Sequence, residues 1–377
     1  MARKGENIYF RKDGRWEGRY IKGKKSDGRP VFGYVYGKKY GEVKSKLLSL
    51  KYRYCSQNSE TNNFQGTLND WVLNWFEDIA KSNIKRSTYS YYQGLIQHHI
   101  LPLLGQIKLN QIKPSDMQQF IDTLLKKGLR PNTVRGVFNL LNRILKKAAD
   151  NRFLIINPCK DVILPKVEKP KIRILTMAEQ QKLEYTAAQD KDGLIVILAL
   201  YTGMRIGELC ALKWSDVDLQ EGIIHVRQTI QRIQCMQLGK SKTEIIFDNP
   251  KSNSSIRMIP LPLNIHKLLS KVKDNAESEY VIPCNNRFSE PRIVNYRFRR
   301  IIEKAGIENV HFHALRHTFA TRFMELGIDV TTLSRILGHS SVKMTLDVYT
   351  DSLIEHKKYA MYKLDTLWTE NLQLQNW

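Results

Sequence analysis

The stretch Thr202-Gly-Met-Arg-Ile-Gly-Glu-Leu-Cys-Ala-Leu212 sets an arginine and a glutamate among small and apolar residues. Arg205 and Glu208 are three positions apart, so they are neighbours on one face of a helix. The apolar run Leu194–Tyr201 lies just before them and predicts a buried helix that leads into the pair. A surface ion pair is one interpretation of this spacing, and a functional pair is the other.

A second charged group, His313-Ala-Leu-Arg-His317, begins another helical run. At 100° per residue, His313, Arg316 and His317 lie within a wedge of roughly 100°, which predicts a concentrated site for an anion. His311 is close enough in sequence to suggest a metal site as an alternative. That interpretation is disfavoured, because no His-Glu-x-x-His motif or cysteine partner accompanies these histidines and the interleaved arginine would repel a cation.

A third group is Ile336-Leu-Gly-His339-Ser-Ser, with Tyr349 ten residues after the histidine. Gly338 is suited to ending one helix, and either of the two serines is suited to capping the next. Tyr349 is one of 17 tyrosines, so by itself it carries no functional information.

The charge of the whole chain points to a polyanionic partner. Its 377 residues include 60 Lys and Arg against 37 Asp and Glu, a formal net charge of +23. The longest apolar run is far shorter than the about 20 residues that cross a bilayer, so no transmembrane segment is expected. No secretory signal is expected either, and five widely spaced cysteines fit reduced thiols in a cytosol better than a disulfide framework.

The first 55 residues carry 16 basic residues and only 5 acidic ones. Asp13-Gly14 between two alternating runs predicts a hairpin with a two-residue turn, and residues 31–36 predict a third strand. Apolar residues at helical spacing from Val43 to Leu50 predict a helix over one face of this sheet. A basic sheet fits nucleic acid better than a membrane surface, which would favour a basic amphipathic helix. The candidate DNA contacts are Arg15, Arg19, Lys22, Lys24 and Lys25.

The rest of the chain divides into four segments. Residues 56–66 lack periodicity and predict a linker. Residues 67–156 predict a bundle of four helices, and the proline-containing, lysine-rich segment 157–172 predicts an extended tether. The last segment, 173–377, mixes helices with strands.

Capping patterns mark where several helices begin. Thr67 with Asp70, and Ser115 with Gln118, predict the starts of two bundle helices. Further bundle helices are predicted from Ser87 to Leu104 and from Pro131 to Asp150. After the tether, a Thr-x-x-Glu pattern predicts another helix start at residues 176–179.

Strand character is concentrated between residues 222 and 261. Strands are predicted over 223–226, 244–247 and 256–259. The polar segment 248–255 predicts a turn that joins the last two. Helices are expected again after Pro291.

Taken in order, these pieces resemble the tyrosine recombinase family, in particular its phage-type and conjugative-transposon integrases. The matching motifs are Thr202-Gly-Met-Arg205-x-x-Glu208-Leu, Lys251 ahead of Ser-Asn-Ser-Ser-x-Arg-x-Ile-Pro, His313-x-Leu-Arg316-His317, Leu337-Gly-His339-Ser-Ser and Tyr349. The resemblance spans nearly the whole chain. It implies an arm-site DNA-binding domain over 1–55, a core-binding domain over 67–156 and a catalytic domain over 173–377. The implied fold is multidomain and mainly α: a small three-stranded sheet plus helix, a helical bundle, and an α+β catalytic domain with a small antiparallel sheet.

The resemblance also implies a nucleophile and a phosphate clamp. Tyr349 would attack DNA phosphorus, form a covalent 3′-phosphotyrosyl link and release a 5′-hydroxyl. A free phenol has a pKa near about 10, so nearby positive charge would favour its phenolate. Arg205 and Arg316 would hold the two non-bridging oxygens, for which a guanidinium fork is well shaped, and Glu208 would support the site.

The remaining motif residues would move protons. His313 and His339 would hydrogen-bond the phosphate, since histidine titrates near neutrality. Lys251 would protonate the departing 5′ oxygen, with Lys240 and Lys242 as alternatives for that role. No metal and no other cofactor is expected, because arginines take the place of a divalent ion and the phosphotyrosine conserves the bond without ATP.

The implied partners are double-stranded DNA, at core and arm attachment sites, and other copies of the chain in a tetramer on a Holliday junction. An excisionase and a host DNA-bending protein are implied helpers, the implied location is the bacterial cytoplasm at the nucleoid, and no membrane is involved. Residues 364–377 would pack on a neighbouring copy or on their own subunit. Two other functions remain open at this point: a type IB topoisomerase and a non-catalytic architectural DNA-binding protein.

Overall fold

The computed structural model describes residues 7–24, 29–47, 50, 64–81, 84–168, 172–235, 243–248, 256–349 and 361. The chain divides into two compact units, Met1–Glu168 and Lys169–Trp377. The predicted features that fall outside the described residues are Lys25, Lys240, Lys242, Lys251, the segment 364–377 and the side chains of Lys24 and Tyr349. The predicted linker 56–66, tether 157–172 and turn 248–255 fall partly outside them.

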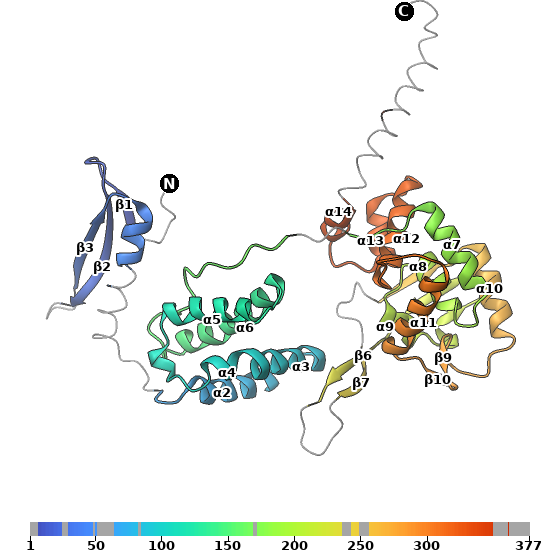
Figure 1. Cartoon of the computed structure of the whole chain (residues 1–377), viewed down its shortest axis with the longest axis horizontal. Coiled ribbons are helices and arrows are strands. Elements are labelled where there is room, and N and C mark those ends of the chain that lie inside the picture. The colour runs from blue at the N-terminus through green and yellow to red at the C-terminus, as the bar shows by residue number, and fades with distance from the viewer. Residues whose placement is uncertain are drawn as a thin grey trace, which may run out of the picture. The chain divides into compact units, whose positions relative to one another are not determined.

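A three-stranded antiparallel sheet begins the first unit (Figure 1). Its strands, in the order β1-β2-β3, are Ile8–Phe10, Trp16–Lys24 and Pro30–Gly37. A helical run over residues 40–47 packs on one face, where Val43 and Leu47 are buried with Ile8 and Tyr20. The predicted sheet and its covering helix are confirmed.

The connection between β1 and β2 differs from the predicted two-residue turn. It spans Arg11–Arg15, and within it only Gly14 has a positive φ, of 79°. The Asp13 carboxylate accepts the Arg15 backbone N–H at 3.2 Å and pairs with the Arg15 guanidinium at 2.9 Å. These side-chain interactions close a wider loop, which needs only one residue in the left-handed region.

A helical bundle completes the first unit. Its elements are α2 (Leu68–Lys81), α3 (Arg86–Leu95), η1 (Ile96–Ile100), α4 (Leu101–Leu104), η2 (Leu109–Gln111), α5 (Pro114–Lys126) and α6 (Pro131–Asp150). The predicted cap at Thr67 and Asp70 is confirmed, since Thr67 donates its N–H to the Asp70 carboxylate at 2.7 Å. The second predicted cap was wrong: α5 is capped at Lys113 with Asp116, because Pro114 occupies its first position.

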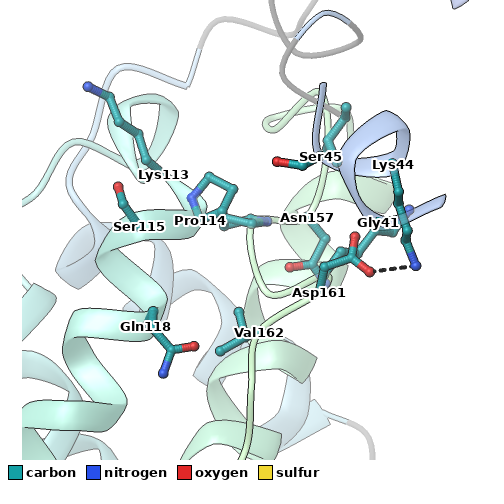
Figure 2. Close-up of a pocket in the computed structure, with 13 residues that line it drawn as sticks. Gly41, Lys44, Ser45, Lys113, Pro114, Ser115, Gln118, Asn157, Asp161 and Val162 are labelled. Carbon is teal, nitrogen blue, oxygen red and sulfur yellow. Dashed lines mark ion pairs between the residues drawn. The ribbon is translucent and has the colours of Figure 1, made fainter. Parts of the chain in front are cut away.

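A cavity lies beside α5, between the helical run 40–47 and the bundle (Figure 2). Its lining includes Gly41, Ser115 and Asn157, and the Lys44 ammonium pairs there with Asp161 at 2.9 Å. None of the motif residues of the second unit lines this cavity.

The second unit is mainly helical. Its helices are α7 (Met177–Ala188), α8 (Leu194–Thr202), α9 (Ile206–Ala211), η3 (Trp214–Asp216), α10 (Leu263–Lys273), α11 (Pro291–Lys304), α12 (His313–Glu325), α13 (Val330–Leu337) and α14 (Val342–Tyr349). As predicted, α8 is largely buried in the core and Thr176 caps α7 together with Glu179. No helix in the described part of the chain is long and apolar enough to cross a membrane.

Three small antiparallel sheets accompany these helices in the part of the second unit that the structure describes. They are β4-β5-β8 (Val217–Asp218, Ile223–Val226, Arg257–Pro260), β6-β7 (Thr229–Gln234, Thr243–Asp248) and β9-β10 (Pro283–Cys284, Arg287–Phe288). The strands on either side of residues 248–255 do not pair with each other. The first pairs with β6, which the sequence analysis missed, and the second pairs with β5, because Ile259 is buried opposite Ile224 in the core. The structure therefore has the fold class that the sequence predicts, since its units are mainly helical and carry small antiparallel sheets.

Candidate active site

Arg205 is the N-cap residue of α9, and Glu208 lies in the first turn of that helix. The Arg205 backbone N–H donates to the Glu208 carboxylate at 2.9 Å, and the Arg205 guanidinium donates to the same carboxylate at 2.8 Å. The Glu208 side chain is only 4% exposed, whereas that of Arg205 is 37% exposed. The carboxylate of this ion pair is therefore buried while its guanidinium is accessible. Because Glu208 is buried, the pair is not the surface ion pair that the sequence left open.

A second arginine meets the same carboxylate from the other side. Arg257, the first residue of β8, donates from Nη2 to Oε2 of Glu208 at 2.8 Å and from Nη1 to Oε1 at 3.2 Å. Burial works to raise the pKa of Glu208, but the hydrogen bonds and charge of Arg257, with the charge of Arg205, outweigh it and hold the pKa at about 2. Glu208 is thus ionised at every physiological pH.

Arg316 lies on α12, which packs against α8. Its Nη1 donates to the Gly203 carbonyl at 2.7 Å and its Nη2 to the Leu337 carbonyl at 2.6 Å. Gly203 ends α8 with a positive φ of 61°, and a β-carbon there would come within 2.5 Å of the Phe319 ring. A glycine is therefore required at the turn that brings this carbonyl to Arg316.

The C-terminal end of α13 gathers all three arginines. Arg257 donates from Nε to the Ile336 carbonyl at 2.5 Å, Arg316 donates to Leu337, and Arg205 donates from Nη2 to the Gly338 carbonyl at 3.5 Å. Gly338 caps the helix in the left-handed conformation, as its sequence position predicted. Helix C-terminal carbonyls carry partial negative charge, so they stabilise cations placed against them. We call this group of Arg205, Arg257, Arg316 and Glu208 the arginine cluster.

The histidines lie beside the arginine cluster, at the ends of two elements. Nδ1 of His339, the residue after Gly338, is 2.8 Å from Oγ1 of Thr345 on α14. Burial, then the charges of Arg316, Arg205 and Arg257, lower the pKa of His339 to about 4. Burial and the charges of Arg316 and Arg205 also lower the pKa of His313. At pH 7 both imidazoles are therefore neutral in the free protein.

His317 lies next to His313, with ring centroids 4.7 Å apart. Burial, His313 and Arg316 lower its pKa to about 4. Among the residues the structure describes, no set of three or more His, Cys, Asp or Glu side chains is arranged to hold a metal ion.

The structure thus brings together five of the predicted site residues from three separate segments: Arg205, Glu208, His313, Arg316 and His339. The backbone of Tyr349 ends α14, the helix tied to His339 through Thr345, while its side chain and Lys251 lie outside the described residues. In the first unit, Arg19 and Lys22 are exposed on β2. Arg15 is exposed at the end of the connection before β2 and is paired with Asp13.

The motif that follows Lys251 contains Arg257, but no role was predicted for this arginine, and Thr345 was not predicted to belong to this region. A signal was available for Arg257, because side chains alternate along a strand and Arg257 shares its face with the buried Ile259 rather than with the exposed Met258. A charged residue on the inward face of a strand needs a buried partner of opposite sign. Nothing comparable in the sequence distinguishes Thr345.

Replacement of Glu208 should destabilise the second unit in a pH-dependent way. Glu208→Gln leaves the buried Arg257 without its counter-charge, so we expect a loss of about 3 kcal/mol at pH 7 in urea unfolding. The folded-state pKa lies below the unfolded-state value, so this contribution is complete above about pH 4.5 and disappears as the pH falls toward 2. The difference in free energy of unfolding between the wild type and Glu208→Gln should therefore disappear between about pH 4.5 and pH 2.

Glu325→Gln is the matched control, because Glu325 pairs with Arg322 at an exposed position. We expect it to change stability by less than about 1 kcal/mol. A Glu208→Gln protein as stable as wild type at pH 7 would contradict the buried pairing.

Comparison with known proteins places this arrangement in a family. The model of the phage integrase family matches residues 172–356, and that of the phage integrase N-terminal SAM-like domain matches residues 67–125. Tyrosine recombinase XerC of Thermodesulfovibrio yellowstonii is 30% identical over 262 residues, which cover 67% of this chain and 82% of that protein. The chain belongs to the tyrosine recombinase family. A XerC-like tyrosine recombinase of Caldanaerobacter subterraneus is 27% identical over 357 residues, with 87% of this chain and 91% of the relative covered.

Solved structures of tyrosine recombinases share the fold. The Tn1549 transposon integrase, solved with circular intermediate DNA, superposes with a TM-score of 0.65 and 22% identity, covering 78% of this chain and 99% of that one. A lambda integrase dimer bound to a core site gives a TM-score of 0.59 at 19% identity over 92% of this chain and 96% of the other. The predicted family and fold class are confirmed.

Proposed function

We propose that the chain is a site-specific DNA recombinase of the integrase kind, which cuts and rejoins DNA strands through a 3′-phosphotyrosyl intermediate and a Holliday junction to integrate or excise a mobile element. The observation that carries this is the convergence of Arg205, Arg316, His313 and His339 in a member of the tyrosine recombinase family. The relatives and structures described above are recombinases and integrases, which favours this function over a topoisomerase or an architectural protein.

In the proposed reaction, Oη of Tyr349 attacks the scissile phosphorus. A new O–P bond forms, the bond from phosphorus to the 5′ oxygen breaks, and that oxygen leaves as a 5′-hydroxyl after taking up a proton from Lys251. The phenol proton passes to a neighbouring base. Rejoining reverses these steps with a 5′-hydroxyl of another strand, so no net bond energy is consumed.

The arginines would stabilise the charge that develops on phosphorus. Arg316 is held as a fork by two carbonyls, and Arg205 is accessible, so each can present N–H groups to one non-bridging oxygen. Burying a phosphate beside His313 and His339 adds negative charge and raises their pKa values from the low values of the free protein, which suits them to donate hydrogen bonds. Glu208 would hold Arg205 in place.

Helical periodicity supports the place of Tyr349. Position 349 is four residues after Thr345, so the two positions share one face of α14, and Thr345 contacts His339. The nucleophile would therefore approach the phosphate from α14, with the imidazole of His339 next to it.

A covalent adduct is the direct test of this function. The full chain is incubated with nicked duplexes covering the DNA that flanks its gene, and the products are separated on a denaturing gel. A protein–DNA adduct, followed by recombinant products when two distinguishable duplexes are mixed, supports the recombinase. Relaxation of supercoils with no exchange of strands would indicate a topoisomerase instead, and DNA binding without an adduct would indicate an architectural protein.

The proposed domain roles follow the predicted boundaries. Residues 1–55 bind arm sites, 67–156 bind the core site and 173–377 carry the catalysis, with 56–66 and 157–172 as connections. The open face of the N-terminal sheet supports its role, because it combines exposed tyrosines with arginines. The Arg19 guanidinium lies 3.7 Å from the centroid of the Phe32 ring, and Arg15 lies over Tyr36. We propose Arg15, Arg19, Lys22, Lys24 and Lys25 as phosphate contacts.

Removal of residues 1–55 should separate the two DNA-binding activities. We expect adduct formation on a nicked core site to stay within about threefold of wild type, whereas affinity for DNA that contains arm sites should fall at least about 30-fold. The slope of affinity against salt concentration should also decrease, since fewer phosphates are contacted. Unchanged binding to arm-containing DNA would contradict the assignment.

The proposed assembly is a tetramer on DNA, as described for lambda integrase on a Holliday junction. An excisionase and a host DNA-bending protein are proposed helpers. Because the substrate is DNA, we place the protein at the nucleoid in the bacterial cytoplasm and propose no membrane partner.

A further inference from the structure

Arg257 is a buried charge for which stability alone gives no reason. Its side chain is 5% exposed and that of its partner Glu208 is 4% exposed. Removing two charges from water costs several kcal/mol per ion, roughly, and apolar residues of similar size often replace such pairs with no loss of stability. A pair of this kind beside an accessible site residue therefore calls for a functional explanation.

The Glu208 carboxylate is shared between a front and a rear arginine. Oε1 accepts from Nη1 of Arg205 at 2.8 Å and from Nη1 of Arg257 at 3.2 Å. Oε2 accepts from the Arg205 backbone N–H at 2.9 Å and from Nη2 of Arg257 at 2.8 Å. Four donors fill the acceptor positions of the carboxylate, so its orientation is fixed, and with it the orientation of the Arg205 guanidinium.

The third donor of Arg257 reaches α13. Its Nε–H bond to the Ile336 carbonyl lies two residues before Gly338, whose carbonyl accepts from Arg205, and three before His339. Arg257 thereby joins β8, Glu208 and the end of α13 into one arrangement.

Charge arithmetic gives Arg257 a second effect. Arg205 and Glu208 alone would sum to zero, and a phosphate would then meet a neutralised arginine. With Arg257 the three groups sum to +1, so a net positive charge remains beside the accessible guanidinium.

We propose that Arg257 is a positioning residue of the recombination reaction: it holds Glu208 and the end of α13, and so keeps Arg205 oriented toward the scissile phosphate with a net positive charge beside it. This inference rests on the proposed function. Arg257 does not contact DNA in this scheme and acts only through its neighbours.

The test compares Arg257→Gln and Arg257→Lys with Arg297→Gln in the full chain. Arg297 is a matched control, because its partly buried guanidinium also pairs with a carboxylate, Asp192, at 3.2 Å and donates to a backbone carbonyl. Single-turnover adduct formation is measured on two nicked duplexes, one with an ordinary phosphodiester at the cleaved position and one with a methylphosphonate. The methyl group replaces one non-bridging oxygen and removes the negative charge of the linkage, so less positive charge is needed.

On the phosphodiester we expect Arg257→Gln to slow adduct formation about 100-fold, Arg257→Lys less, and Arg297→Gln less than about threefold. On the methylphosphonate the defect of Arg257→Gln should shrink to about tenfold or less. An equal defect on both duplexes, or wild-type rates for Arg257→Gln, would overturn the positioning role. Failure of the wild type to form any adduct would instead overturn the proposed function.

Discussion

Replacement of Tyr349 by phenylalanine should abolish the covalent protein–DNA adduct and all recombination. The change removes one oxygen atom and leaves the ring, so we expect adduct formation to fall by at least about 10⁴-fold with little change in DNA affinity. The magnitude is large because none of the described site residues supplies a phenol: the arginines are cationic, and the histidines would give a far less stable bond to phosphorus. The measurement is adduct yield on a nicked core duplex together with a binding isotherm on the same DNA.

Tyr296→Phe serves as the control for this experiment. Tyr296 lies on α11 of the same unit and is exposed, so the loss of its hydroxyl should leave adduct yield and affinity unchanged. An adduct that persists in Tyr349→Phe would show that a different residue attacks the phosphate.

Replacement of Arg316 by lysine should reduce adduct formation about 10³-fold. An ammonium keeps the charge, but it lacks the planar fork that spans the Gly203 and Leu337 carbonyls while it faces a phosphate oxygen. We expect one carbonyl to lose its donor and the charge to shift away from the phosphate. Rates are measured under single-turnover conditions, and unfolding is followed in parallel to confirm that the variant stays folded.

Arg322→Lys is the matched control on the same helix. The Arg322 guanidinium also donates to a backbone carbonyl, that of Leu175, at 2.7 Å, but its other partners are Gln180 and Glu325. We expect its rate to stay within about threefold of wild type. If Arg316→Lys and Arg322→Lys reduced the rate of adduct formation equally, Arg316 would act through general packing.

Local sequence signals predicted most individual elements of this protein. The Thr67 and Thr176 caps, the buried helix at 194–202 and the glycine end of α13 depend on interactions within a few residues. The errors occurred where a nearby residue changed the local geometry, as Pro114 did at the start of α5 and Asp13 did in the first hairpin.

Strand partners depend on distant parts of the chain. Residues 244–247 and 256–259 are neighbours in sequence, but burial of Ile259 opposite Ile224 moves β8 into another sheet. The residue pattern of each segment predicted that it forms a strand, but it carried no information on which other strand it pairs with.

The family, the mainly helical class and the residue types of the site could be predicted from the sequence, because they follow from the order and spacing of Arg205, His313, Arg316, His339 and Tyr349 along the chain. The folded chain was needed to show that two arginines share Glu208 and that three successive carbonyls at the C-terminal end of α13 accept from three guanidinium groups. The physical reason is that a buried charge is stabilised by partners tens of residues away, which chain folding alone brings within hydrogen-bond distance.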